Sequence, residues 1–582
     1  MMTKIPFSPA LADKELSHSS LSALWLGRLP KILMRTLITA VMIGLFVIPI
    51  VKLILLSFTY QHGLSLALYQ EVFSEKKTWI TLANTVRLTA GATVLALGLG
   101  VALAWILVFT DIRFKKAFHV LTLLPLVIPS YIFTLAWTQL LSTRGLAAAL
   151  LARLPGSPQP FNLYSFAGIL LVLGLAHYPL VYLLTAAVLR KIPQQLELAG
   201  QASGAGRFTV FARITLPLAL SGIGGGGLLA FLACLDNFGI PAFLGIPAHI
   251  PVLSTLIYTE IVGFGPTAFG RAAVLSVLLG LLALAGSLGF WLLCRRRKTI
   301  DLSAPEQEPR FRLGKYRGPL EIGLGLFFLV TGIVPLAAMF LTSLIKAYGL
   351  DLQLANLTFK HYHFVLLESP KTVGALRNSL LLALAVTAVC LIAGSALAYF
   401  RVRRSPWLGT LWETVAGLPY ALPGMVFGLA MIFTWMEPWP GWNPGIYGTV
   451  KILLLAYAIR FLVLQIRASS ASFMQIEPAI EEAAASSGAG LFAQWRAIVV
   501  PLLLPGLLSG AFLVFTHALT ELTVSSLLSS SGAETIGMII FNFEQGGYTV
   551  YSTAFSGVVL IFIALVALLL QAVLHFIRRR HD

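Results

Sequence analysis

Long apolar runs alternate with short polar segments along the whole chain of 582 residues. Twelve of the runs have about 20 residues or more, the length that an α-helix needs to cross the hydrocarbon core of a bilayer. Because apolar residues fill each run without alternating, each run predicts a membrane-spanning helix. The approximate spans are 37–58, 84–109, 118–141, 163–188, 216–238, 271–294, 319–345, 379–400, 411–435, 446–466, 500–525 and 554–577. The pattern predicts an all-α polytopic membrane protein.

The twelve spans form two sets of six that repeat one another. Residues of the second and third spans recur 294 positions later: Asn84 as Asn378, Pro125 as Pro419, and Pro129 as Pro423. Since each half has an even number of spans, the halves are expected to be parallel repeats, related by an axis along the membrane normal. The prolines interrupt helical hydrogen bonding and predict either static kinks or hinges.

These repeats divide the chain into five parts: an N-terminal tail (1–36), a first transmembrane domain (37–294), a linker (295–318), a second transmembrane domain (319–577) and a short tail (578–582). The linker is polar and basic and has no periodic apolar face. It predicts a solvated tether, with a membrane-surface patch as the alternative. The N-terminal tail contains Asp13 and Glu15 and lacks the pattern of a signal peptide, so we expect it to be retained.

Charge is scarce and unevenly placed. Only 11% of the residues are charged and 58% are hydrophobic, whereas soluble domains carry about 25% charged residues. The net charge of +18 would suit a nucleic-acid partner, but most of the 41 Lys and Arg fall in the tails and in alternate loops. This asymmetry follows the positive-inside rule and predicts that both termini are cytoplasmic. The basic balance therefore indicates topology in a lipid bilayer, and no nucleic-acid partner is expected.

One polar loop recurs in the two halves, at 196–217 and, 284 positions later, at 480–501. A Gly-Ala-Gly sequence interrupts each copy and predicts a sharp turn between two short helices, because Gly accepts positive φ. A proline in each copy lies where the next span is expected to begin. The loops predict a projecting helix–turn–helix that docks a partner; an amphipathic helix lying on the membrane is the alternative. The shared residues include Glu197/Glu481, Ala199/Ala483, Ser203/Ser487, Gly204/Gly488, Ala205/Ala489, Gly206/Gly490, Ile214/Ile498 and Pro217/Pro501.

Both loops resemble the EAA motif of binding-protein-dependent ABC transporter permeases, whose pattern is roughly E-A-A-x3-G-x9-I-x-L-P. The second copy matches at Glu482, Ala483, Ala484, Gly488, Ile498 and Pro501, with Val500 at the usual Leu position. The first copy keeps Ala199, Gly204, Ile214, Leu216 and Pro217. It has Leu198 and Gly200 where Glu and Ala are expected, and Glu197, one residue earlier, is a candidate to compensate. The first docking contact is therefore expected to be the weaker one.

The resemblance implies the transmembrane-domain fold of a type I ABC importer, in which each loop is a coupling helix that fits a cleft of an ABC ATPase subunit. It also implies an extracytoplasmic substrate-binding protein and a bacterial inner-membrane location. ATP and Mg²⁺ are expected in a separate ATPase dimer and no cofactor in this chain, because no G-x4-G-K-[ST] sequence is present. The chain is thus expected to be a transport subunit and not an enzyme. The predicted coupling residues are Glu197, Ala199, Gly204, Gly206, Pro217, Glu481, Glu482, Ala483, Ala484, Gly488, Gly490 and Pro501.

Four polar residues inside or at the ends of spans are functional candidates, because ionisable groups in a membrane are costly. Asp236 and Glu521 are 285 positions apart, and His177 and Arg460 are 283 apart. They predict a translocation path; equally, Arg460 could pair with an acid such as Glu521 to fix helix packing. The cysteines (Cys234, Cys294, Cys390) and outer-loop histidines (His249, His361, His363) have no spacing that predicts a metal site.

The fused layout and the segment ALTELTVSSLL at 518–528 most resemble ferric iron importer permeases. Thiamine permeases are the next alternative, followed by polyamine and phosphonate systems. A secondary transporter of the major facilitator type also has two sets of six spans and a central linker. Its loop signature is only faintly echoed at 111–116, and such a transporter would not need two EAA loops.

Overall fold

The structure is a computed structural model that describes residues 32–60, 63–142, 145–151, 161–263, 265, 267–294, 309–350, 353–439 and 443–579. The predicted N-terminal tail up to residue 31, the linker up to residue 308 and residues 580–582 of the C-terminal tail lie outside these ranges. The described chain is almost entirely helical, with one small hairpin of β1 (Thr59–Tyr60) and β2 (Gly63–Leu64).

The helices of the first half begin with a span that runs from Ile32 to Ser57. It contains η1 (Ile43–Val47) and α2 (Ile48–Ser57). The others are α3 (Ala67–Ser74), α4 (Lys76–Phe109), α5 (Lys115–Val127), α6 (Ser130–Leu141), α7 (Leu146–Leu151), α8 (Phe166–Leu189), α9 (Gln194–Ala202), α10 (Arg207–Val210), η2 (Phe211–Thr215), α11 (Leu216–Asp236), η3 (Pro241–Gly245), α12 (Leu253–Val262) and α13 (Ala268–Cys294).

The second half repeats this order. Its helices are η4 (Gly314–Tyr316), α14 (Arg317–Phe328), η5 (Leu329–Ile333), α15 (Val334–Ser343), η6 (Leu354–Asn356), α16 (Lys360–His363), η7 (Phe364–Glu368), α17 (Pro370–Tyr399), η8 (Phe400–Arg404), α18 (Pro406–Ala421), α19 (Gly424–Trp435), α20 (Val450–Gln475), α21 (Pro478–Ser486), α22 (Leu491–Gln494), η9 (Trp495–Val499), α23 (Val500–Leu519), α24 (Ser525–Leu528), α25 (Ile536–Gln545) and α26 (Thr549–Arg579).

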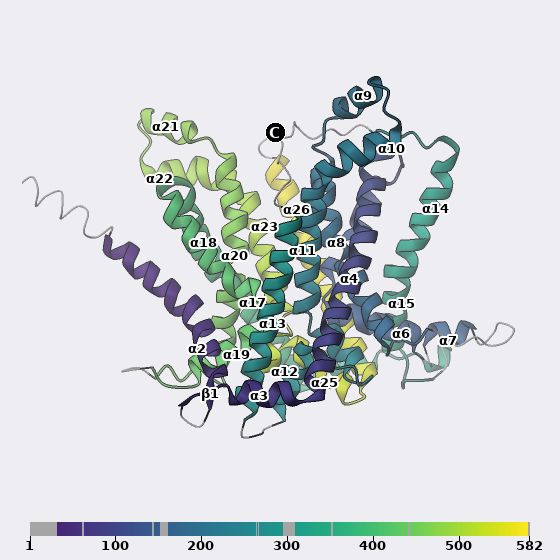
Figure 1. Cartoon of the computed structure of the whole chain (residues 1–582), viewed down its shortest axis with the longest axis vertical. Coiled ribbons are helices and arrows are strands. Elements are labelled where there is room, and N and C mark those ends of the chain that lie inside the picture. The colour runs from purple at the N-terminus through teal and green to yellow at the C-terminus, as the bar shows by residue number, and fades with distance from the viewer. Residues whose placement is uncertain are drawn as a thin grey trace, which may run out of the picture.

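Each half is built around three long packed helices, α4, α8 and α11 in the first and α17, α20 and α23 in the second (Figure 1). Glycines let these helices approach closely: a Cβ on Gly226 would lie 2.7 Å from the Val181 backbone, and a Cβ on Gly510 would lie 2.7 Å from the Ala468 side chain. Small residues at helix contacts are what membrane bundles use, because lipid supplies no hydrophobic drive for association. The predicted duplication is thus visible in the packing.

Ten of the twelve predicted spans are continuous helices in the described chain, long and apolar enough to cross a membrane. The other two, predicted at 118–141 and 411–435, are broken. α5 and α6 meet at a bend of 103°, and α18 and α19 at a bend of 105°. Pro129 and Pro423 are the N-caps of the second limbs, so the repeated prolines mark sharp breaks and not gentle kinks, since proline lacks the N–H that would continue the helix.

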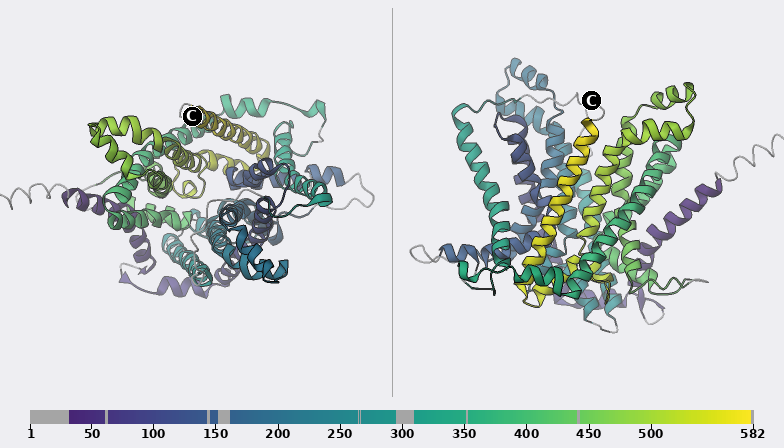
Figure 2. Two further views of the ribbon diagram at one scale, coloured as in Figure 1. Left: turned by 90° about the horizontal axis from the view of Figure 1, so that it is seen from above. Right: turned by 180° about the vertical axis from the view of Figure 1, so that it is seen from behind.

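The first span of each half packs on the other half. α2 contacts α19 of the second half, and α15 contacts α6 of the first. Near the opposite end of the first span, the Trp412 indole N–H donates to Thr39 Oγ1 at 3.1 Å. Because each broken helix is covered by a span from the other half, the two halves form one interlocked bundle, as the two views of Figure 2 show.

The two ends of the bundle differ in kind. The repeated loops, α9–α10 and α21–α22, project from one end, here named the loop end (top of Figure 1). The short helices α3, α12 and α25 lie at the opposite end. There Asn84 Nδ2 donates to Pro251 O at 3.1 Å before α12, and Asn378 Nδ2 donates to Gly532 O at 3.0 Å before α25. The repeated asparagines therefore hold equivalent loops.

Candidate functional site

Each repeated loop is a helix–turn–helix closed by a glycine in the left-handed region. Gly204 has φ +83° and Gly488 has φ +82°. Ala205 N donates to Gly200 O, and Ala489 N donates to Ala484 O, both at 3.1 Å. This six-residue hydrogen bond around a positive-φ glycine is the Schellman motif, which ends a helix sharply. The structure thus shows the turn that the Gly-Ala-Gly sequence predicted.

Pro217 and Pro501 lie in the first turn of α11 and of α23, so each proline is at the start of the next membrane α-helix, as the sequence predicted. The helical arm of the loop, α10 or α22, runs into this helix without a gap. A π-helical turn, η2 or η9, ends two residues before each proline. Proline lacks an N–H and crowds the preceding turn, and a π-turn changes the hydrogen-bond partners at that point. The second arm of each loop is therefore continuous with a membrane span.

Glu197 and Glu481 point inward, each toward an arginine. Arg310 Nη1 lies 2.8 Å from Glu197 Oε1, and Arg403 Nε donates to Glu481 Oε1 at 3.0 Å. Both arginines also donate to a backbone carbonyl five residues before the glutamate, that of Ile192 or of Ile476. The two glutamates therefore have the same structural task, which is to hold the first arm of the loop against its own half.

This geometry corrects one expectation for the first loop. Glu197 is only 9% exposed and also accepts from Thr215 Oγ1 at 2.5 Å. A carboxylate held in this way does not face a partner, so Glu197 does not compensate for Leu198. The residue equivalent to Glu197 is Glu481, whereas the EAA glutamate Glu482 is exposed and occupies the position of Leu198.

The outward faces of the loops carry an aromatic side chain that the motif had not marked. Phe208 is 81% exposed and Phe492, 284 positions later, is 78% exposed. The first loop also exposes Leu198, at 53%, and the second loop exposes Glu482 at the equivalent position. A large apolar side chain repeated within a polar loop was the available signal, because an exposed aromatic residue at a projecting tip suits insertion into a partner's groove.

Gly200, the other departure from the motif, has a packing reason. A Cβ at this position would lie 2.8 Å from Ile214 Cδ1 and 3.2 Å from Val210 Cγ2. The equivalent residues of the second loop are Ala484, Gln494 and Ile498. The side chains of Ile214 and Val210 therefore take the space that an alanine methyl group would need in the first loop, and the turn glycine has the same backbone conformation in both loops.

Two of the four predicted path residues form an ion pair between the halves. Asp236 Oδ2, at the end of α11, lies 2.8 Å from Arg460 Nη2 on α20. The other oxygen, Oδ1, accepts from the backbone N–H of Gly424, the first residue of α19. Asp236 thus caps the broken helix of the second half, where the break leaves an N–H without a helical partner. Arg460 pairs with Asp236 and not with Glu521, the acid suggested from the sequence.

Glu521 serves its own half. Its carboxylate accepts from the backbone N–H groups of Val524, at 2.8 Å, and Ser525, at 2.9 Å. The residue with the same role in the first half is Asn237, whose Oδ1 accepts from Ile240 N at 2.8 Å. Asn237 and Glu521 are 284 positions apart. Asp236 and Glu521 are therefore not equivalent, since the sequence comparison was one residue out of register.

His177 is likewise one residue away from the position equivalent to Arg460. The N-caps Ser165 of α8 and Thr449 of α20 fix the register at 284, which makes His177 equivalent to Phe461. His177 Nδ1 lies 2.8 Å from Leu173 O and 3.6 Å from Cys234 Sγ. A shift of one residue rotates a side chain by about 100° around a helix. The structure therefore brings Asp236 and Arg460 into direct contact. His177 and Glu521 make other hydrogen bonds but lie within electrostatic range of this pair, His177 of Asp236 and Glu521 of Arg460.

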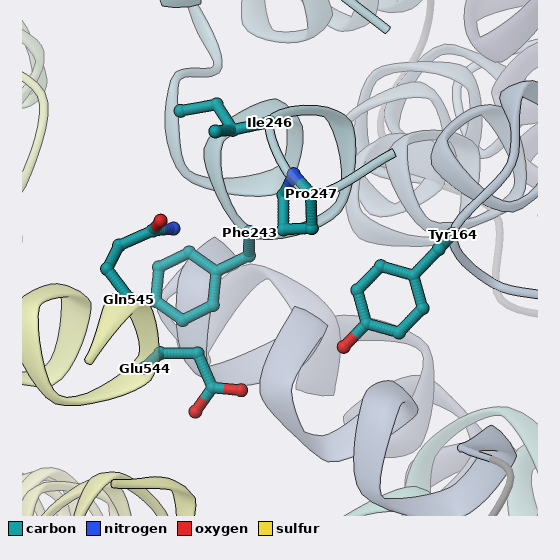
Figure 3. Close-up of a pocket in the computed structure, with 6 residues that line it drawn as sticks. All are labelled: Tyr164, Phe243, Ile246, Pro247, Glu544 and Gln545. Carbon is teal, nitrogen blue, oxygen red and sulfur yellow. The ribbon is translucent and has the colours of Figure 1, made fainter. Parts of the chain in front are cut away.

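A cavity of about 460 Å³ lies between the halves at the end opposite the loops. Tyr164, Phe243 and Ile246 come from the first half, and Glu544 and Gln545 come from α25 (Figure 3). Gln545 Nε2 donates to Ala242 O at 3.4 Å across this boundary. α25 is too short to span a membrane. Burial raises the pKa of the Glu544 carboxyl, on this helix, to about 7.

Within the described ranges, His, Cys, Asp and Glu form no group of three or more that could hold a metal ion.

A duplicated bundle of spans, interlocked across two broken helices and bearing a projecting loop on each half, defines a polytopic membrane transport component. The chain belongs to the family described as binding-protein-dependent transport system inner membrane component, whose pattern matches residues 95–296 and 390–582. One match lies in each half, and each match includes one of the repeated loops. The protein is therefore a multi-pass inner-membrane permease subunit of an ABC importer, a transport subunit and not a catalytic one.

Several proteins are similar to this chain. A putative ferric transport system permease protein of Haemophilus influenzae is 25% identical over 83% of this chain and 77% of its own length. A ferric transport system permease protein of Actinobacillus pleuropneumoniae is 27% identical over 77% of this chain and 65% of its own length. The molybdenum transport system permease of Escherichia coli K12 is 29% identical over 35% of this chain and 90% of its own length. A bacterial alginate ABC importer structure matches 47% of this chain and 99% of that one, with 19% identity and a TM-score of 0.40.

Proposed function

We propose that this chain forms the translocation path of an ATP-driven ferric iron importer. The family match in both halves and the two loops with the same backbone conformation support the role as an ATP-driven importer. Three of the relatives that match most of the chain length are named for ferric transport, and they support ferric iron as the substrate.

The two loops are the docking sites for an ATPase dimer, which supplies ATP and Mg²⁺. Phe208 and Phe492 project from equivalent places and fit grooves of two equivalent subunits. The positive-inside distribution of Lys and Arg supports a cytoplasmic loop end and cytoplasmic termini. A binding protein then delivers the substrate to the opposite end, where α3, α12 and α25 lie.

The cavity at that opposite end suits a cation better than an oxyanion. It carries the Glu544 carboxyl and the Tyr164 hydroxyl (Figure 3). Carboxylate and phenol oxygens are hard donors that match hard cations, whereas Glu544, whose pKa is raised to about 7, repels an anion such as molybdate when it is ionised. This chemistry supports ferric iron over molybdate, although a molybdenum permease is among the relatives.

Uptake in cells that lack this chain tests the proposal. We expect labelled ferric iron uptake to be lost on deletion and restored by the wild-type chain, while thiamine, putrescine and molybdate uptake are unchanged. Deletion of the partner ATPase should abolish the restored uptake. Ferric uptake that continues without any ATPase partner would instead indicate a secondary transporter, and loss of a different substrate would reassign the cargo.

Glu544 allows a sharper test of the cavity. Glu544→Gln removes the charge and keeps the shape, and Gln545→Glu is a matched control that adds a carboxylate one residue away. We expect Glu544→Gln to lower ferric uptake at limiting substrate and to leave ATPase assembly intact. If both variants transport like the wild type, the cavity is not part of the entry route.

A further inference from the structure

The inward glutamates of the two loops are held by arginines from different parts of the chain. In the second half Arg403 belongs to η8, the end of the span that begins with α17. The position 294 residues earlier, at the end of α4, is Phe109. The first half thus lacks an arginine at the place that supplies it in the second. Arg310, from the end of the linker, provides the guanidinium instead.

Arg310 reaches this place because its backbone is attached to the end of α4. Arg310 N and Phe311 N both donate to Phe109 O at 2.9 Å. The guanidinium carbon lies 4.3 Å from the centroid of the Phe109 ring, a cation–π contact. Only 5% of the Arg310 side chain is exposed. Phe109 therefore serves as the platform on which the linker arginine lies, at the position that the second half fills with its own arginine.

The following residues extend this attachment, which is called here the linker clamp (residues 309–317). Leu313 N donates to Asp111 Oδ1 at 2.9 Å, and Arg317 pairs with the other oxygen of the same carboxylate. The Leu313 hydrogen bond, more than the Arg317 charge, lowers the pKa of Asp111. The expectation of a solvated tether is therefore wrong for this end of the linker.

Aromatic packing joins the clamp to the loop. The Phe311 ring lies 5.9 Å from Trp105 of α4, and Trp105 lies 4.8 Å from Phe211, which begins the π-turn of the first loop. The clamp also leads directly into α14, the first helix of the second half. One short segment thus contacts the first coupling loop, the end of α4 and the second half.

We propose that Arg310 is a positioning residue for the first coupling loop, supplied by the linker in place of the arginine that the second half carries within its own span. The inference rests on the proposed docking of an ATPase at both loops. Its consequence is that the first loop is held by the linker segment that leads into the second half, whereas the second loop is held by a span of its own half. Movement of α14 relative to α4 would therefore act on the first loop alone.

Relocation of the arginine tests this proposal in the full complex with its ATPase. Arg310→Ala should lower ATP-driven uptake about tenfold, as expected for the loss of a charge-assisted hydrogen bond of roughly 1.4 kcal/mol or more. It should also weaken cross-linking of the ATPase to a cysteine at Ala205 in the first loop, but not to one at Ala489 in the second. Arg310→Ala with Phe109→Arg should restore both. Arg312→Ala, an exposed neighbour, is the control for net charge.

The outcomes separate this proposal from the one on which it rests. If neither loop of the wild type cross-links to the ATPase, the docking proposal fails. If both loops cross-link and Arg310→Ala changes nothing, the docking stands and the positioning role is wrong. Should Phe109→Arg fail to assemble, the charge exchange Glu197→Arg with Arg310→Glu provides the second rescue. A loss that neither rescue restores also overturns the positioning role.

Discussion

The two repeated loops share one backbone and differ in their exposed side chains and in the arginines that hold them. The turn glycines have φ values within one degree of each other, and both loops present a phenylalanine. The second loop adds the exposed Glu482, where the first has Leu198. The difference teaches that the fold preserves the position of the loop, while charge at the outer face and the source of the inner arginine have diverged.

The two broken helices show the same division. Both bend by more than 100° after an equivalent proline pair. In the second half the break is capped by Asp236 and approached by Arg460. The positions equivalent to these two residues are Thr520 and Ala176. One break is thus held by an ion pair between the halves, and the other has no charge at the corresponding places.

Removal of the Asp236 charge should have the largest effect on stability, because it removes the ion pair that distinguishes one broken helix from the other. Asp236→Asn leaves the nearly buried Arg460 without its counter-charge, and we expect a loss of about 2–3 kcal/mol in stability, toward the lower end because Asp236 is partly exposed. Thermal unfolding of the purified chain in detergent measures it. Thr520→Ala, at the equivalent position, should change the unfolding temperature little.

A double variant sharpens the same measurement. Asp236→Asn with Arg460→Leu removes both charges and should unfold at a higher temperature than Asp236→Asn alone, since an unpaired buried charge costs more than no charge. An equal or lower unfolding temperature for the double variant would show that the pair does not account for the loss.

Valine at either turn glycine should have the next largest effect, and the same one in both loops. Gly204→Val and Gly488→Val place a side chain in left-handed backbone, at a cost of about 1–2 kcal/mol, with open space around both positions. We expect each to reduce uptake about tenfold or more while the chain remains in the membrane. Gly206→Ala and Gly490→Ala, also in open space, are the controls. Normal uptake by Gly488→Val would contradict the coupling role.

Exchange of the outer side chains should have the smallest effect and tests the asymmetry itself. Leu198→Glu gives the first loop the carboxylate of the second, and Glu482→Leu removes it from the second. Exposed charges at the rim of an interface contribute about 0.2–1 kcal/mol, so we expect changes of a few-fold in ATPase affinity and opposite signs for the two variants. If both variants changed the ATPase affinity in the same direction, the two ATPase sites that receive the loops would not be equivalent.

Much of the architecture was predictable from local pattern. Ten spans lie where the apolar runs indicated, because a run of about 20 apolar residues satisfies the requirement for crossing a bilayer without reference to the rest of the chain. The turn at Gly204 and Gly488 followed from a local property of glycine. The paired prolines indicated where the two spans are interrupted, although the sequence pattern does not predict the angle between the two helices.

The contacts between distant segments were not predictable. The pair Asp236–Arg460 joins residues of different halves, and the offsets of 285 and 283 suggested a different pairing. The capping contacts of Asn237 and Glu521 set the register at 284, as do the N-caps Ser165 and Thr449. An alignment error of one residue is small in sequence but turns a helical side chain to another face.

What the sequence determined by itself is the set of spans, their duplication and the two loops, since hydrophobic length and backbone conformation are properties of short segments. The tertiary structure decided which glutamate of each loop faces inward, and that Arg310 of the linker takes the place of an arginine missing at Phe109. Position in the chain does not determine these pairings. They depend on which polar groups the folded bundle brings together away from water, where each of them needs a partner.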